Sequence, residues 1–151
     1  LCIEALFDAL SEEPVDRLLD VGTGSAILAL AALRKGVKQA TALDIDPTAL
    51  EAAAQNARLN QLHHRLQLIP GGPGAVQGTW PLVVANILAA PLIHMAPILA
   101  TRLSSRGRLI LSGITDTLEA EVRQAYRRVG IEHRETRFRN GWVALSLHTT
   151  W

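Results

Sequence analysis

Short apolar runs alternate with segments of helical periodicity along the whole chain. Seven apolar or alternating runs predict strands at 17–21, 39–43, 65–69, 82–85, 108–111, 131–138 and 142–148. Four stretches between them repeat apolar residues on one helical face and predict helices at 27–33, 47–60, 91–103 and 117–129. This alternation is typical of a mostly parallel α/β sheet covered by helices on both faces.

Turn-forming residues mark the ends of several elements. Gly36 suits the C-terminus of the helix before it. Asp46 can cap the next helix, with Pro47 in the first turn. Pro97 is expected to kink or split the third helix, and the Gly- and Pro-rich stretch 70–81 is expected to be a loop.

The dipeptide Asn140-Gly141 joins the last two expected strands. Asn-Gly favours a tight hairpin turn, so the final strand is predicted to run antiparallel to its partner. Dinucleotide-binding sheets more often continue with parallel strands, whereas the seven-stranded sheet of methyltransferases ends in such a hairpin. The chain therefore resembles the class I methyltransferase fold, a Rossmann-like, mostly parallel sheet with an antiparallel C-terminal strand.

The stretch 18–25, Leu-Leu-Asp-Val-Gly-Thr-Gly-Ser, carries the first chemical signal. It reads as a strand that runs into a glycine turn and then into a helix. Gly22 and Gly24 can take positive φ and let the backbone approach a ligand closely. About twenty residues later the stretch 43–47, Leu-Asp-Ile-Asp-Pro, places Asp44 where a carboxylate can accept hydrogen bonds from ribose hydroxyls. Together the two stretches predict a nucleoside site.

The spacing of the glycines indicates which nucleoside binds. Ile27 occupies the place of the third glycine of the dinucleotide fingerprint, where a bulky residue would obstruct close packing of helix and strand. No Lys-Ser/Thr pair follows that would indicate a phosphate loop. The stretch 20–26, Asp-Val-Gly-Thr-Gly-Ser-Ala, instead resembles the S-adenosylmethionine motif, with Ala26 in place of its last glycine. The predicted cofactor is S-adenosyl-L-methionine.

Asn86 carries the second chemical signal, since it follows the apolar run Val83-Val84-Ala85. Ligands of open α/β sheets bind at the carboxyl ends of strands, so Asn86 is expected in the same crevice as the glycine turn. Its side-chain carbonyl could accept a hydrogen bond from an incoming amine and orient it for methyl transfer. No residue is marked by the sequence as a general base.

Composition limits the remaining possibilities. A chain of 151 residues with 48% hydrophobic residues and a net charge of +1 fits one compact domain over 1–151. No apolar run reaches the roughly 20 residues of a membrane span, and no signal peptide is recognisable, so a cytoplasmic protein is expected. The lone Cys2 predicts neither a disulfide nor a cysteine metal cluster, and His63-His64 lacks further ligands, so no metal site is predicted.

Arginines are concentrated in the last third of the chain. A basic face there could meet RNA or an acidic protein, but no RNA-binding motif with interleaved aromatics accompanies it, so nucleic acid is a weakly supported partner. The arginines concerned are Arg123, Arg127, Arg128, Arg134, Arg137 and Arg139.

Nearly the whole chain resembles the bacterial ribosomal protein methyltransferases of PrmA type, which modify amines of large-subunit ribosomal protein eleven. The resemblance rests on 20–31, 44–47, 56–60 (Asn-Ala-Arg-Leu-Asn), 84–89 and 108–114 (Arg-Leu-Ile-Leu-Ser-Gly-Ile). The specific part is Asn-Ile-Leu-Ala at 86–89, where most amine and amide methyltransferases of this fold carry Asn-Pro-Pro and an aromatic residue.

By this resemblance, a ribosomal protein is the partner and Asn86 is the catalytic residue that faces the target nitrogen. Motif and resemblance together nominate the cofactor-binding residues Asp20, Gly22, Thr23, Gly24, Asp44, Ile45 and Asn86. The family also has an amino-terminal domain that binds the ribosomal protein, and a Gly-Thr-Gly-x-His-Pro-Thr-Thr segment that closes over the cofactor. Neither is present in these 151 residues.

Three other functions remain open from the residues alone. A methyltransferase of a small molecule or nucleic acid would share every cofactor residue. A nicotinamide-dependent oxidoreductase is disfavoured by Ile27 and by the terminal hairpin, and a non-catalytic binding module of the same fold would have lost cofactor binding. In the plainest interpretation, the glycines form a simple turn, Asp44 caps the turn that follows it, and Asn86 satisfies backbone groups at the end of its strand.

Overall fold

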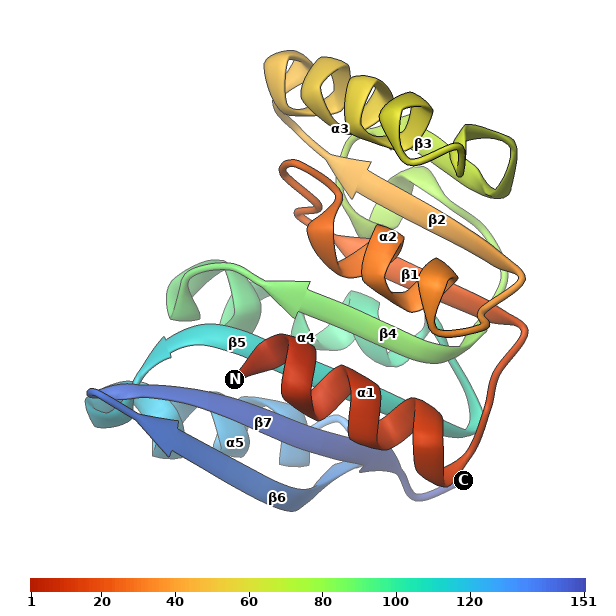
Figure 1. The fold of residues 1–151 in the computed structure, drawn as a ribbon. Helices are drawn as coiled ribbons and strands as arrows, with labels where there is room; N and C mark the ends of the chain where they lie inside the picture. Colours follow the sequence, from red (N-terminus) through yellow and green to blue (C-terminus); the bar gives the residue numbers. More distant parts are fainter.

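A computed structural model describes all 151 residues and contains one mixed sheet of seven strands (Figure 1). The strands are β1 (Arg17–Val21), β2 (Gln39–Asp44), β3 (Leu66–Pro70), β4 (Trp80–Asn86), β5 (Leu103–Thr115), β6 (Ile131–Arg139) and β7 (Trp142–Thr149). Their order is β3-β2-β1-β4-β5-β7-β6, parallel from β3 to β5, with β7 antiparallel to both neighbours. The predicted fold class and the antiparallel hairpin are confirmed.

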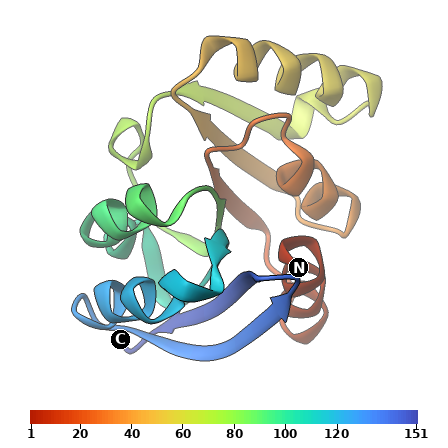
Figure 2. The ribbon, with the colours of Figure 1, turned by 90° about the vertical axis from the view of Figure 1, so that its left-hand side faces the viewer.

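Five α-helices cover the two faces of the sheet. They are α1 (Cys2–Glu12), α2 (Ile27–Arg34), α3 (Pro47–Leu59), α4 (Ala89–Ala100) and α5 (Glu119–Arg127), with 3-10 turns at His63–Arg65, Pro73–Ala75 and Asp116–Leu118. Helices α1, α2 and α3 lie on one face, and α4 and α5 lie on the other (Figure 2). None of the helices combines the length and apolar character needed to span a bilayer.

The central strands read as continuous apolar runs because both of their faces are buried. In β4, Val83 and Ala85 belong to the apolar cluster beneath α4 and α5, whereas Leu82 and Val84 belong to the cluster beneath α1 and α2. Neighbouring side chains of a strand point to opposite faces, so a strand covered on both sides needs apolar residues throughout.

The carboxyl ends of β1, β2 and β4 meet at one edge of the sheet, here called the carboxyl edge, which faces the viewer in Figure 2. After β1 the chain moves outward to β2 and β3, then returns to place β4 on the other side of β1. This reversal of strand order opens the position where open α/β sheets bind ligands. The predicted site residues lie on the segments that leave this edge.

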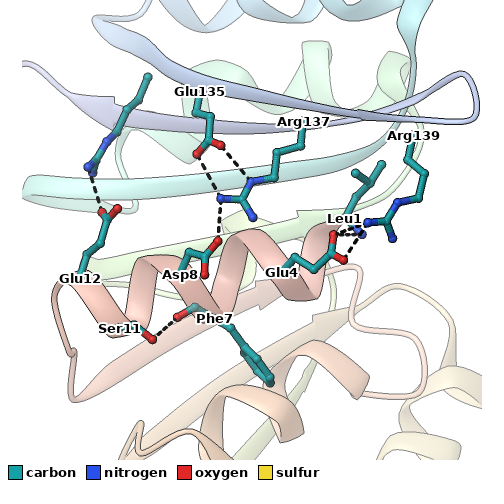
Figure 3. A network of polar contacts seen from close by, with 10 residues as sticks. Leu1, Glu4, Phe7, Asp8, Ser11, Glu12, Glu135, Arg137 and Arg139 are labelled. Carbon is teal, nitrogen blue, oxygen red and sulfur yellow. Dashed lines mark hydrogen bonds and ion pairs between the residues drawn. The ribbon is translucent and has the colours of Figure 1, made fainter.

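Helix α1 was not predicted from the sequence. Its buried residues Cys2, Ala5, Leu6 and Leu10 face the sheet and α2. Its outer side carries an acidic stripe that meets arginines of β6 in reverse order (Figure 3). The ion pairs are Glu4–Arg139 at 2.8 Å, Asp8–Arg137 at 2.8 Å and Glu12–Arg134 at 2.9 Å. We call these three pairs the α1–β6 seam.

Several predicted boundaries were wrong. The helix predicted at 91–103 is α4, which continues through Pro97 without a break and ends before Leu103 begins β5. The segment expected at 117–129 is divided into a 3-10 turn and the shorter α5. The predicted loop 70–81 contains a 3-10 turn, and its last two residues already belong to β4.

Candidate active site

Residues 22–26, here called the glycine turn, connect β1 to α2 at the carboxyl edge. Gly22 and Gly24 take φ values of +70° and +55°, as predicted from the motif. A Cβ on Gly22 would lie 2.5 Å from Cγ2 of Ile87, so a side chain here would force the segment after β4 to move. Ala26 also has a left-handed φ of +66° and is fully buried, which explains why glycine would suit this position.

Asp20 is buried beneath the glycine turn and holds it from within. Its Oδ2 accepts hydrogen bonds from Oγ1 of Thr23 at 2.7 Å and from the backbone N–H of Ala29 at 3.2 Å. Oδ1 has no hydrogen-bond partner. Burial raises the pKa of Asp20 to about 6, against the lowering effect of the two hydrogen bonds. The hydrogen bond between Asp20 and Thr23 therefore helps to fix the conformation of the glycine turn from its buried side.

Asp44 links the end of β2 to the glycine turn. Its Oδ2 accepts from the backbone N–H of Gly24 at 2.8 Å, and its Oδ1 accepts from the backbone N–H of Asp46 at 3.0 Å. Each carboxylate oxygen keeps a second lone pair for a ligand. The neighbouring Asp46 accepts from the N–H of Thr48 at 2.9 Å and caps α3, which confirms its predicted role.

Asn86 ends β4 on the same edge and is exposed. The next residue, Ile87, donates its backbone N–H to the carbonyl of Ser112 on β5 at 3.1 Å. Ile45 and Leu88 add two apolar side chains, 83% and 67% exposed, beside Asp44 and Asn86 in the sequence. All of the predicted site residues thus come from three adjacent strand ends.

Gly113 is a residue of the site region that was not predicted. It lies at the irregularity of β5 between Leu111 and Ile114, with a φ of +81°. A Cβ there would lie 2.5 Å from the carbonyl oxygen of Ile87. The Ile87 backbone therefore packs directly on Gly113 while its side chain packs on Gly22. A glycine two residues after the predicted apolar strand 108–111 was the available signal.

Ile27 does not play the part expected of it. Its side chain is 56% exposed at the start of α2, so it does not obstruct the packing of helix against strand. The buried position of close approach is that of Ala26. Evidence against a dinucleotide fingerprint therefore comes from the sheet order and hairpin rather than from this side chain.

Other ionisable groups have no evident chemical role. Burial raises the pKa of Cys2 to about 12, which keeps the thiol protonated. No group of three or more His, Cys, Asp or Glu side chains is placed to hold a metal ion. Trp80 is buried at the start of β4, whereas Trp142 at the start of β7 is 45% exposed.

The sheet order, the terminal hairpin and the glycine turn define a class I methyltransferase domain. The model of the family "Ribosomal protein L11 methyltransferase (PrmA)" matches residues 1–150, and the chain belongs to this family. A curated ribosomal protein L11 methyltransferase from Pelobacter propionicus is 42% identical over 148 residues, which is 96% of this chain and 48% of that protein.

Solved structures agree with this assignment. A ribosomal protein L11 methylase from Lactobacillus delbrueckii subsp. bulgaricus superposes with a TM-score of 0.91 at 31% identity, covering 97% of this chain and 76% of that one. The magnesium protoporphyrin IX methyltransferase of Synechocystis PCC 6803, solved with bound SAM, shares the fold with a TM-score of 0.81 at 18% identity. The superposition covers 98% of this chain and 78% of the Synechocystis chain. The chain spans about half the length of the curated relatives it matches.

Proposed function

We propose that the protein transfers a methyl group from S-adenosyl-L-methionine to an amine of a ribosomal protein, with ribosomal protein L11 as the substrate. The family membership supports the reaction and the substrate, because the relatives carry this activity in their names. A ribosomal substrate would place the protein in the cytoplasm. The observation that carries the proposal is the hydrogen bond from the backbone N–H of Gly24 to the carboxylate of Asp44 at the carboxyl edge.

The residues at this edge fit the predicted cofactor. Gly22 makes room for the side chain of Ile87. At Gly24 no atom lies within 4 Å of where a Cβ would be, so a ligand can approach the main chain closely there, beside the carboxylate of Asp44. Asp44 would accept hydrogen bonds from the ribose hydroxyls through its remaining lone pairs. Ile45 would offer its exposed side chain to the adenine base, and Asp20 with Thr23 would keep the turn in shape.

The acceptor is proposed to be a lysine side chain or an N-terminal amine that approaches Asn86. The bound cofactor supplies a methyl group already activated by a sulfonium. The side-chain carbonyl of Asn86 would accept a hydrogen bond from the amine nitrogen and aim its lone pair at that methyl group. A lysine amine has a reference pKa of about 10.4 and must lose a proton first. The sequence marks no residue as a general base and Asn86 is exposed, so this proton would leave to solvent.

Binding of S-adenosylhomocysteine tests the cofactor site. Asp44→Ala should weaken binding by about 1 to 3 kcal/mol, measured by calorimetry, because charge-assisted hydrogen bonds to the ribose are lost. The matched control is Asp46→Ala, which removes the α3 cap two residues away and should bind nearly as tightly as the unchanged protein. Equal binding by the Asp44→Ala protein would overturn the ribose assignment.

Two further arms separate the competing functions. NAD should give no heat of binding, and tight NAD binding would favour the oxidoreductase alternative. Transfer of labelled methyl from S-adenosylmethionine should occur to isolated ribosomal protein L11 and not to ribosomal RNA. Labelling of the RNA alone would replace the proposed substrate with a nucleic acid.

A further inference from the structure

Asn56 contacts the glycine turn from outside the predicted motif. It lies on α3 and donates a hydrogen bond from Nδ2 to the backbone carbonyl of Ser25 at 2.9 Å, across 31 residues of sequence. Only two other side chains from outside the turn bond to it, those of Asp20 and Asp44. Asp20 holds Thr23, Asp44 holds Gly24 and Asn56 holds Ser25, so three consecutive residues are each tethered separately.

Asn56 and Asp44 belong to one structural unit. Asp44 ends β2, Asp46 caps α3 two residues later, and Ala53 and Ala57 bury the inner side of α3. Asn56 precedes Ala57 and is half-buried, with its side chain directed toward the start of α2. The β2–α3 unit therefore binds the turn at two points: the carboxylate of Asp44 accepts from the N–H of Gly24, and the side-chain amide of Asn56 donates to the carbonyl of Ser25.

The backbone on both sides of Ser25 has an unusual conformation that the hydrogen bond from Asn56 can stabilise. Gly24 on one side and Ala26 on the other both have left-handed φ values, of +55° and +66°. An L-residue in this conformation is disfavoured, so Ala26 holds it only when the surroundings fix the backbone. The first turn of α2 provides no side-chain cap at Ala26. The bond from Asn56 fixes the peptide unit that joins Ser25 to Ala26.

We propose that Asn56 is a positioning residue of the cofactor site. By holding the Ser25 carbonyl, it keeps the Gly24 N–H on Asp44 and so keeps that carboxylate aimed at the ribose. It acts through the turn and does not itself touch the cofactor. This inference rests on the proposed function, because it assigns the turn and Asp44 to S-adenosylmethionine.

The decisive variant is Asn56→Asp, which keeps the size of the side chain but cannot donate the hydrogen bond. Asn60→Asp is the matched control, since it introduces the same charge one helical turn further along. Asn60 donates to the carbonyl of Asn56 at 2.9 Å and forms no hydrogen bond with the turn. Asn56→Asp should weaken S-adenosylhomocysteine binding roughly 3- to 10-fold, the range of one neutral hydrogen bond, whereas Asn60→Asp should change it less than about twofold.

Steady-state kinetics with saturating protein substrate give a second readout. Asn56→Asp should raise KM for S-adenosylmethionine and leave kcat near that of the unchanged protein, because the tether affects binding rather than the transfer step. Unchanged binding and KM in this variant, or an equal loss in Asn60→Asp, would overturn the proposal.

Amide hydrogen exchange without ligand separates this inference from the function beneath it. Asn56→Asp should speed exchange at Gly24 and Ala26, and Asn60→Asp should not. If the unchanged protein failed to bind S-adenosylhomocysteine, the proposed function would fall, and faster exchange at these amides would still support the tether. Unaltered exchange would remove the tether whatever the ligand.

Discussion

The α1–β6 seam and the glycine turn both join segments far apart in sequence, but they do so by opposite means. The seam matches carboxylates of one helix with guanidinium groups of one strand, largely at the surface (Figure 3). At the turn, Asp20 and Asp44 take part in none of the ion pairs of the protein and accept hydrogen bonds from backbone N–H groups instead.

The difference shows that the hydrogen bonds at the glycine turn, rather than the ion pairs of the seam, fix the backbone geometry. Exposed ion pairs are screened by salt and hold long, flexible side chains, so each contributes about 1 kcal/mol or less. A short carboxylate bonded to a main-chain amide constrains the backbone itself. The turn therefore keeps two acidic groups without a cationic partner, beside the place where a positively charged sulfonium is proposed to bind.

Gly113→Ala should have the largest effect, because it disturbs the backbone that supports the turn. The new Cβ would meet the Ile87 carbonyl at 2.5 Å on a left-handed backbone. Overpacking and left-handed strain together predict a loss of about 3 to 5 kcal/mol in the free energy of unfolding, measured by denaturant titration. Gly141→Ala is the control, since its φ is +79° but no atom lies within 4 Å, and it should cost about 1 to 2 kcal/mol. Equal losses in both variants would show that the contact with Ile87 is unimportant.

Asp20 should make the stability of the protein depend on pH. Burial raises its pKa from 3.8 to about 6. Between these values the unfolded chain releases a proton that the folded protein retains, so the free energy of unfolding falls as pH rises, by up to about 3 kcal/mol. Asp20→Asn has no such proton, and its stability relative to the unchanged protein should improve from pH 4 to pH 7.

Urea unfolding of both proteins at pH 4, 5.5 and 7 measures this difference. Asp16→Asn, at an exposed residue paired with Lys38, controls for the removal of a surface carboxylate. Parallel curves for the unchanged and Asp20→Asn proteins would show that Asp20 does not retain its proton in the folded state.

The seam pairs should have the smallest effects. Asp8→Asn and Glu12→Gln should each lower the free energy of unfolding by less than about 1 kcal/mol, and the loss should shrink in 1 M salt. Arg108→Met is the contrast: this buried arginine of β5 also holds the C-terminal part of α1, but by donating to the backbone carbonyls of Ala9 and Glu13. It should cost about 2 kcal/mol at any salt concentration. If all three variants lost the same stability, and that loss shrank in high salt, ion pairs and hydrogen bonds to the backbone would contribute in the same way.

The parts of the fold that were predicted correctly have local causes. β4 and the centre of β5 are buried on both faces and therefore form uninterrupted apolar runs, and Asn140-Gly141 specifies a hairpin by its own backbone preference. The start of β5 was missed because Ser104, Ser105 and Arg106 are polar and precede the doubly buried segment. Helix α1 was missed although Ala5, Leu6 and Leu10 recur at helical spacing.

The candidate site divides in the same way. The glycine turn and the acid after β2 were predicted because each lies within one short stretch. The contacts that hold them were not, because Asn56 on Ser25, and Ile87 between Gly22 and Gly113, join residues that only the fold brings together. Whether these residues bind the cofactor remains a prediction for the experiments above.

The position of β7 has a consequence for the order in which the molecule assembles. β7 lies inside the sheet between β5 and β6, although it follows both in the chain. A polypeptide synthesised through Arg139 contains six of the seven strands, but β6 has no strand to pair with. The arginines of β6 are therefore not yet held opposite the carboxylates of α1. The sheet and the α1–β6 seam can close only after 142–149 has emerged. Until β7 forms its hairpin with β6 and pairs with β5, one edge of β5 lacks a partner, and an unpaired strand edge makes a partly folded chain prone to aggregation.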